Sequence, residues 1–265
     1  MNRTEEHTHG DARGCVIVTG AASGIGRATT SALISERWQV LALDCNAEAL
    51  EVLRRDVDPC DALTIHAVDV TRTTEVGRIF SELPDATPLR GLVCCAARGD
   101  NTRFLDISLD SLHSLIELNF IATFSICQTA ARCMVKEGGG SIVNISSVSG
   151  LRANAGRSAY GSSKAAVEML SKVMAVELAP FNVRVNALAP GPTLTEMAAK
   201  MHDGAERRRL LSSVPQARYA SPDEIAQGVA FLLDPIRSGY ITGHTLCVDG
   251  GMFAAGSFEP VVDAS

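Results

Sequence analysis

Residues 15–26 read Cys-Val-Ile-Val-Thr-Gly-Ala-Ala-Ser-Gly-Ile-Gly, and this stretch decides the fold class. Its first four residues form an apolar run that predicts a short buried strand, and residues 25–36 predict a helix. Glycines at a strand-to-helix turn let the backbone approach a diphosphate, which the helix N-terminus stabilises. The spacing is G-x-x-x-G-x-G rather than G-x-G-x-x-G, but the surrounding strand and helix favour a dinucleotide site over a simple tight turn.

Strand-like and helix-like segments alternate along the whole chain. The predicted strands are 15–18, 39–43, 63–68, 91–95, 141–145, 183–188 and 245–248, and the predicted helices are 25–36, 46–55, 73–81, 108–136, 158–179 and 222–233. This alternation predicts an α/β fold, a single-domain doubly wound parallel sheet (Rossmann fold) of about seven strands with helices on both faces. Ligands bind at the carboxyl ends of such strands. The candidates expected to meet there are Thr19, Asp44, Ala96, Ser146–Ser147 and Pro190–Gly191.

The 265 residues predict one domain, because no linker, internal repeat or low-complexity tract divides them. Residues 14–255 are expected to form a single dinucleotide-binding and catalytic domain. A mobile N-terminal tail (1–13) and a C-terminal tail (256–265) are expected to flank it. Residues 192–220 are interrupted by prolines and a glycine and predict a short helical excursion. It is interpreted as a lid over the substrate, with a plain surface insertion as the alternative.

The net charge of −6 argues against nucleic acid or an anionic membrane as a partner. No apolar stretch approaches the ~20 residues of a membrane span. The polar N-terminus has no secretory signal pattern, so a cytoplasmic location is expected. The eight cysteines include no C-x-x-C pair and mostly occupy apolar contexts, which predicts reduced, packed thiols and no metal site.

Tyr160 and Lys164 lie four residues apart in a predicted helix and therefore share one face. A nearby ammonium favours the phenolate, which would let Tyr160 exchange a proton near neutral pH. This spacing alone is common in ordinary amphipathic helices. Ser147, thirteen residues upstream, and the glycine-rich loop favour the catalytic interpretation.

Together these motifs resemble the short-chain dehydrogenase/reductase superfamily, in its branch of about 250 residues with TGxxxGxG and YxxxK motifs. The resemblance covers roughly residues 14–252 and rests on Thr19–Gly26, Asp69, Asn119, Ser147, Tyr160–Lys164, Pro190–Gly191 and residues 240–251. One segment departs from the family pattern. Cys94-Cys95-Ala96-Ala97 stands where the family usually has Asn-Asn-Ala-Gly, beside the adenosine part of the cofactor, which puts the geometry and stability there in question.

The resemblance implies hydride transfer between a nicotinamide and a small secondary alcohol or ketone, with Tyr160 as general acid or base. It implies that Lys164 binds the nicotinamide ribose and lowers the pKa of Tyr160. Ser147 would hydrogen-bond the substrate oxygen, and the family spacing selects it over Ser146. Asn119 would anchor a water that relays protons to Lys164; a buried, hydrogen-bonded asparagine is the alternative.

The expected cofactor is NAD. Asp44 ends the second predicted strand, where a carboxylate can accept hydrogen bonds from the adenosine ribose and would repel a 2′-phosphate. Neither Ser23 nor Cys45 is basic, although Arg27 could turn towards a phosphate. The resemblance adds Asp69 near the adenine, and Thr193 and Thr195 near the carboxamide. The expected cofactor-binding set is Gly20, Ser23, Gly24, Ile25, Gly26, Asp44, Asp69, Val70, Ala96, Tyr160, Lys164, Pro190, Gly191, Thr193 and Thr195.

Two other functions compete with a dehydrogenase or reductase. A sugar-nucleotide epimerase or dehydratase shares Tyr-x-x-x-Lys but typically has G-x-x-G-x-x-G and a larger C-terminal domain. A non-catalytic NAD-binding sensor usually lacks the serine, tyrosine or lysine, and all three are present here.

The expected partner is a small alcohol or carbonyl compound, with neither nucleic acid nor membrane. The resemblance implies a homo-oligomer, a tetramer or dimer, packed through residues 108–136 and 158–179. The sequence leaves the substrate open. Three arginines that follow strand ends either contact a carboxylate or are solvated surface charges: Arg98, Arg103 and Arg152.

Overall fold

The computed structural model describes residues 13–57, 61–83, 87–201 and 204–255. These residues form a sheet of seven parallel strands in the order β3-β2-β1-β4-β5-β6-β7. The strands are β1 (Cys15–Thr19), β2 (Gln39–Asp44), β3 (Leu63–Ala67), β4 (Leu89–Cys94), β5 (Gly140–Ile145), β6 (Val183–Pro190) and β7 (Thr245–Val248). The expected doubly wound parallel sheet is confirmed. The tails predicted for 1–13 and 256–265 lie outside the described residues, apart from Arg13.

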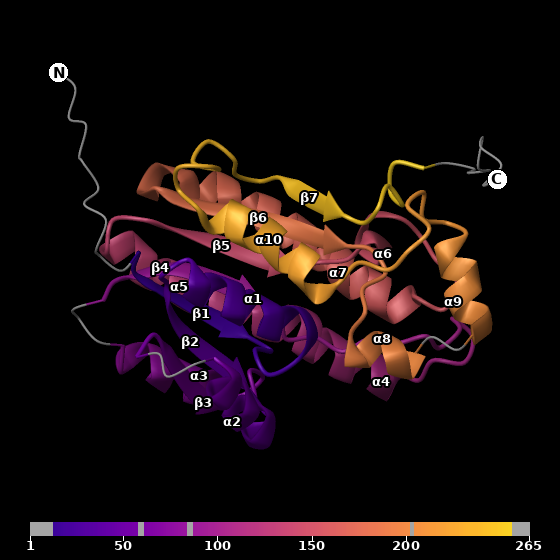
Figure 1. Cartoon of the computed structure of the whole chain (residues 1–265), viewed down its shortest axis with the longest axis horizontal. Coiled ribbons are helices and arrows are strands. Elements are labelled where there is room, and N and C mark those ends of the chain that lie inside the picture. The colour runs from indigo at the N-terminus through magenta and orange to yellow at the C-terminus, as the bar shows by residue number, and fades with distance from the viewer. Residues whose placement is uncertain (1–12, 58–60, 84–86, 202–203, 256–265) are drawn as a thin grey trace.

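Helices connect the strands and cover both faces of the sheet (Figure 1). They are α1 (Gly24–Ser35), α2 (Ala47–Asp56), α3 (Thr73–Ser81), α4 (Leu109–Ile116), the π-helical turn η1 (Glu117–Ile121), α5 (Ala122–Lys136), α6 (Val148–Leu151), α7 (Ser158–Leu178), the 3₁₀ turn η2 (Ala179–Phe181), α8 (Glu196–Met201), α9 (Gly204–Leu211) and α10 (Pro222–Leu233). Within the described ranges no helix has the length and apolarity that a membrane crossing requires.

Strand β1 shows why the sheet needs helices on both sides. All five of its residues are buried, and successive side chains of a strand point to opposite faces. Ile17 joins the apolar cluster formed with α3, α5 and α7, whereas Val16 and Val18 join the cluster formed with α1, α2 and α10. A continuously apolar strand is stable only when both of its faces are covered. Figure 1 shows α1 and α10 packed side by side on one of those faces.

The strand order reverses direction beside β1, and this reversal places the functional site. The chain runs from β1 outward to β2 and β3, then crosses back so that β4 pairs with the other side of β1. The connections leaving β1 and β4 therefore diverge to opposite faces and leave a crevice at the carboxyl ends of these strands. Ligands of doubly wound sheets bind in such a crevice.

The predicted helix 108–136 is wrong in one respect, because it is not a regular α-helix throughout. Between α4 and α5 the chain makes the π turn η1, and Asn119 lies in this turn with no exposed surface. The Asn119 side chain accepts a hydrogen bond from the Arg98 N–H (2.9 Å) and donates to the Arg98 carbonyl (3.0 Å) and the Ser163 hydroxyl (3.1 Å). The wider turn lets one amide tie the β4–α4 connection to α7.

Asp234, just after α10, is a buried carboxylate with a dense set of donors. It accepts hydrogen bonds from the N–H groups of Ile236 (2.8 Å) and Arg237 (2.9 Å), and from the side chains of Arg13 (2.9 Å) and Arg237 (3.0 Å). Burial opposes ionisation, but these hydrogen bonds and charges hold the pKa of Asp234 at about 2. The unfolded pKa is about 3.9, so this stabilisation is complete above about pH 5 and is lost as the pH falls towards 2.

We expect Asp234→Asn to lower the free energy of unfolding by about 2 kcal/mol at pH 7, and by about half as much at pH 3. Urea unfolding followed by fluorescence of the single tryptophan, the buried Trp38, measures both values. The exposed Asp106→Asn is the control, with a change below about 0.5 kcal/mol. A loss for Asp234→Asn that is equal at the two pH values would contradict this account.

Candidate active site

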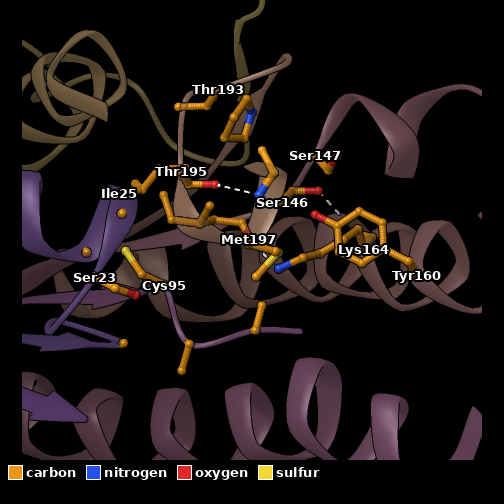
Figure 2. Close-up of a pocket in the computed structure, with 18 of the residues that line it drawn as sticks. Ser23, Ile25, Cys95, Ser146, Ser147, Tyr160, Lys164, Thr193, Thr195 and Met197 are labelled. Carbon is orange, nitrogen blue, oxygen red and sulfur yellow. Dashed lines mark hydrogen bonds between the residues drawn. The ribbon is translucent and has the colours of Figure 1, made fainter. Parts of the chain in front are cut away.

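A cavity of about 370 Å³ opens at the carboxyl ends of the strands (Figure 2). Every residue predicted to bind the cofactor lines it, together with Ser147. Asn119 is the one predicted site residue that does not line the cavity, and it lies beneath, between the β4–α4 connection and α7. The structure therefore brings the predicted set together from α1, from α7 and from the carboxyl ends of β1, β2, β3, β4, β5 and β6.

The glycine-rich loop folds so tightly that two of its glycines cannot be replaced without movement. Gly20 has φ +63°, and a Cβ there would lie 2.8 Å from the backbone nitrogen of Ala96. A Cβ on Gly26 would lie 2.0 Å from the carbonyl oxygen of Gly20, far inside van der Waals contact. These glycines hold the start of α1 against the ends of β1 and β4.

We expect Gly26→Ala to abolish binding of reduced nicotinamide dinucleotide and to destabilise the protein by about 3 kcal/mol, because backbone must move to admit the methyl group. Titration of cofactor fluorescence and urea unfolding measure the two effects. Gly77→Ala in α3 is the matched control, since nothing lies within 4 Å of its Cβ. It should raise stability by up to about 1 kcal/mol, and a neutral Gly26→Ala would disprove the crowding argument.

The N-terminus of α1 is arranged to receive an anion. Ser23 is its N-cap residue, yet its side chain makes no capping hydrogen bond, and no acidic residue lies in the first turn. The first backbone hydrogen bond of the helix runs from the Arg27 N–H to the Ser23 carbonyl, so the earlier N–H groups have no helical partner. Ser23, Gly24 and Ile25 all line the cavity, and this end of α1 fits the diphosphate of a dinucleotide.

Asp44 lies at the end of β2 beside the same loop. One carboxylate oxygen accepts a hydrogen bond from the Ala22 N–H (3.0 Å) and the other from the Asn46 N–H (2.9 Å). Each oxygen keeps a further lone pair for a ribose hydroxyl. The neighbouring carboxylate of Asp69 accepts from the N–H and hydroxyl of Thr71, and these bonds lower the pKa of Asp69.

The unusual segment Cys94–Ala97 keeps its connection to β1 through the backbone. The Thr19 hydroxyl accepts hydrogen bonds from the N–H groups of Cys95 and Ala96, both at 3.1 Å. Any residue except proline supplies such an N–H, so replacing the usual asparagines leaves this link intact. The Cys94 thiol is buried 3.8 Å from the thiol of Cys127, and Cys95 lines the cavity, where burial raises the pKa of its thiol to about 12.

Ser147, Tyr160 and Lys164 converge at the end of β5 (Figure 2). Ser147 caps α6 by accepting a hydrogen bond from the Ser149 N–H (3.1 Å), and its side chain also hydrogen-bonds with that of Tyr160. The Ser146 hydroxyl instead donates to the backbone carbonyl of Lys164 (3.2 Å). The geometry therefore agrees with the choice of Ser147 over Ser146 as the partner of the tyrosine.

The electrostatics of Tyr160 differ from the sequence-based expectation. Burial raises the pKa of Tyr160, while hydrogen bonding with Ser147 and the charge of Arg157 work in the opposite direction. Lys164 is buried as well, which lowers the pKa of its ammonium to about 8. The Lys164 Nζ donates to the Ile145 carbonyl (2.8 Å) and lies 6.0 Å from the centroid of the Tyr160 ring. In the protein alone, burial outweighs the Ser147 hydrogen bond and the charge of Arg157 in setting the pKa of Tyr160.

The region 192–220 contains the expected helical excursion, as two short helices, α8 and α9. Thr195 caps α8 by accepting a hydrogen bond from the Ala198 N–H (3.1 Å), shown dashed in Figure 2, and Thr193 donates to the Gly191 carbonyl (3.0 Å). Leu210 of α9 packs with Val148, Val214 and Met252 at the cavity. This position over the cavity agrees with a lid, and closure stays a prediction.

None of the three arginines weighed as carboxylate contacts lines the cavity. Arg98 and Arg103 are exposed, and Arg152 donates to the carbonyls of Met252 (2.6 Å) and Ala255 (3.5 Å). The cavity instead holds Arg157, which the sequence reasoning missed. Its position three residues before Tyr160 in the sequence was a usable signal, because residues at that spacing are neighbours on a helix.

The chain is similar to known proteins over most of its length. The family model described as enoyl-(acyl carrier protein) reductase matches residues 20–253. Carbonyl reductase family member 4 of Xenopus tropicalis is 35% identical over 236 residues, which are 89% of this chain and 96% of the relative. A solved structure described as a short chain dehydrogenase/reductase family protein has a TM-score of 0.84 at 32% identity, covering 92% of this chain and 99% of the other.

The chain belongs to the short-chain dehydrogenase/reductase superfamily. Another solved relative, ElxO with NADP bound, has a TM-score of 0.85 at 28% identity and covers 91% of this chain and 99% of its own. Membership of this superfamily makes the protein an oxidoreductase that acts on carbonyl or CH–OH substrates with a nicotinamide cofactor. The residues of the cavity fit such a cofactor. The uncapped N-terminus of α1 could receive its diphosphate, and Tyr160 lines the same cavity.

Proposed function

We propose that the protein is an NAD(H)-dependent oxidoreductase that transfers a hydride between the nicotinamide and a small secondary alcohol or ketone. The observation that carries the proposal is the meeting of Ser147, Tyr160 and Lys164 in the same cavity as the α1 N-terminus and Asp44. Asp44 ends β2 and Ser147 follows β5, three strand spacings away in the sheet. At about 4.8 Å for each spacing, the two ends are about 14 Å apart, a separation that an extended dinucleotide spans.

The chain's own residues would move the proton, while the bound nicotinamide supplies or accepts the hydride. In alcohol oxidation the Tyr160 oxygen takes the hydroxyl proton, and in ketone reduction the same phenol returns it to the developing alkoxide. Ser147 hydrogen-bonds the substrate oxygen and holds it beside Tyr160. Lys164 binds the nicotinamide ribose, and its charge favours the Tyr160 phenolate.

We propose that Asn119 supports the site from below the cavity. Its amide joins the backbone of Arg98 to Ser163, the residue before Lys164, and so fixes the lysine relative to the β4–α4 connection. We also propose that Asn119 anchors a water that relays protons to Lys164, as the family resemblance implies.

The proposed preference for NAD over NADP rests on the charges around Asp44. A 2′-phosphate carries about −1.5 to −2 charges at neutral pH and would lie against this carboxylate. Arg27, the basic residue that could have compensated, is paired with Asp56 on α2. Although the solved relative ElxO binds NADP, the charges around Asp44 favour the cofactor that lacks the phosphate.

The substrate end of the cavity has an apolar wall. Val148, Met197, Leu210 and Met252 line it from four different segments. Such a wall favours a substrate with a hydrocarbon portion next to the reacting carbonyl.

Exposed apolar side chains support the proposal of a homo-oligomer. Several lie on the outward faces of η1, α5 and α7, the same two segments that the sequence indicated: Ile121, Phe124, Met169, Val173 and Val176. Large apolar side chains exposed on helices in this way favour an interface between subunits.

The proposed function is tested by following nicotinamide absorbance at pH 7–9, with NAD(H) and NADP(H) each offered a panel of secondary alcohols and ketones that differ in hydrocarbon length. NAD-linked turnover that rises with an added hydrocarbon group is the expected result. Tight NAD binding without turnover across the panel would point to the sensor instead. Turnover with NADP alone would overturn the assigned preference.

A further inference from the structure

Arg157 lies against the catalytic tyrosine. It is the N-cap residue of α7, and the central carbon of its guanidinium, Cζ, lies 5.6 Å from the centroid of the Tyr160 ring. One of its nitrogens donates to the carbonyl of Asp100 (3.1 Å) in the β4–α4 connection. Arg157 therefore touches both the aromatic ring that carries the reacting oxygen and the loop beside it.

A guanidinium in this position has a defined effect on the phenol. A cation within about 6 Å of an aromatic centroid is attracted to the electrons of the ring, and more strongly when the site is shielded from water. Ionisation of the phenol adds a full negative charge to the side chain, so the attraction is stronger in the phenolate than in the phenol. Arginine stays protonated at any accessible pH, which makes its contribution constant.

Other charged and titratable groups around Tyr160 do not duplicate this effect. The other charged or titratable residues that line the cavity, within the described part of the chain, are Asp44 at the end of β2, Cys45 after β2, Asp69 after β3, Cys95 after β4, Lys164 on α7 and Glu196 on α8. The carboxylate of Asp100 is engaged with the N–H and hydroxyl of Thr102. Lys164 is the other cation near the ring, but burial lowers its pKa to about 8. Arg157 is thus the cation whose charge persists in the alkaline range.

We propose that Arg157 is a positioning residue for the reaction, which holds the Tyr160 ring in place and favours the phenolate form of that side chain through its charge. The inference deepens the proposed function and rests on it, since Tyr160 is there the general acid or base. The opposing influences on the Tyr160 pKa, burial upward and Arg157 downward, agree with this assignment. The Asp100 contact fixes the guanidinium over the ring.

The ionisation of Tyr160 can be measured without any substrate. The chain has three tyrosines, Tyr160, Tyr219 and Tyr240, so a Tyr219→Phe/Tyr240→Phe background leaves Tyr160 as the only source of tyrosinate absorbance. In this background Arg157→Gln is expected to raise the titration midpoint by about 0.5–1.5 pH units. Arg157→Lys should restore part of the shift. Fluorescence of Trp38 at each pH shows whether the protein stays folded.

Arg103→Gln is the matched control, because Arg103 is an exposed arginine in the β4–α4 connection that Arg157 contacts, and it does not line the cavity. Its midpoint should equal that of the unaltered background. An unchanged midpoint in a folded Arg157→Gln protein would overturn the proposal, because Arg157 would then only tie the loop through Asp100.

The pH dependence of kcat/KM provides a second test. In alcohol oxidation the rate rises with pH as Tyr160 ionises, so a higher pKa moves this limb of the kcat/KM profile to higher pH. We expect Arg157→Gln to shift the limb by the same amount as the spectroscopic midpoint and to leave the Kd for NADH unchanged. A limb that does not move would contradict the proposal. If the wild-type enzyme has no Tyr160-dependent turnover, the proposed function fails, and the absorbance titration still decides the role of Arg157.

Discussion

Tyr160→Phe is expected to lower kcat by about 10²–10⁴-fold and to leave the affinity for NADH almost unchanged. The substitution removes only the phenolic oxygen. The ring that packs beneath the Arg157 guanidinium and beside Lys164 remains, so the cavity keeps its shape. Loss of the oxygen removes the group that we propose exchanges a proton with the substrate. Steady-state rates with the best substrate of the panel, together with NADH fluorescence titration, separate the two quantities.

Tyr240→Phe is the control for this experiment, because Tyr240 is fully exposed and remote from the cavity lining. Its kcat should equal that of the wild type. A Tyr160→Phe enzyme that keeps a tenth or more of the wild-type kcat would show that another group moves the proton. Loss of NADH binding in that variant would instead mean that the phenol is needed to hold the cofactor.

Asp44→Asn is expected to change the cofactor preference towards NADP by roughly 100-fold in the ratio of kcat/KM values. Asparagine keeps a side-chain oxygen that can accept one of the two backbone hydrogen bonds, from Ala22 or Asn46, so the loop should stay in place. The change removes the negative charge that would face a 2′-phosphate. NAD should bind more weakly, because neutral asparagine forms weaker hydrogen bonds to the ribose than a carboxylate does.

The preference is measured from kcat/KM for NADH and NADPH with one carbonyl substrate. Glu48→Gln, an exposed acidic residue at the start of α2, controls for a general change in surface charge. Its preference should match that of the wild type. If wild-type enzyme already prefers NADPH, or if Asp44→Asn leaves the ratio unaltered, Asp44 does not select the cofactor.

The sheet and most of the candidate site were predictable from sequence because local patterns determine them. β1 is a continuous apolar run followed at once by closely spaced glycines, and both features are visible in twelve consecutive residues. The carboxyl ends of parallel strands must meet at one edge, so residues 19, 44, 96, 146–147 and 190–191 could be placed together from the strand pattern alone.

The π turn at Asn119 and the environment of Tyr160 were not predictable in the same way. A π turn inserts one residue into a helix without altering which residue types are present, so the apolar pattern of 108–136 still predicts a continuous helix. The pKa of Tyr160 depends on two features: burial by segments far apart in the chain, and the position of the Arg157 side chain. Likewise Met252 lines the cavity and accepts a hydrogen bond from Arg152, a contact between residues 100 positions apart in the chain.

That anchoring of Met252 and Ala255 by Arg152 bears on how the enzyme can be attached to other materials. Met252 lines the cavity at the carboxyl ends of the strands, whereas Arg13 leads into the amino end of β1, at the opposite end of the strands. A resin, electrode or fluorescent protein joined beyond residue 255 would pull on a wall of the catalytic chamber. Attachment ahead of residue 13 places the load at the far end of the strands, so immobilised or fused forms should be built from that end.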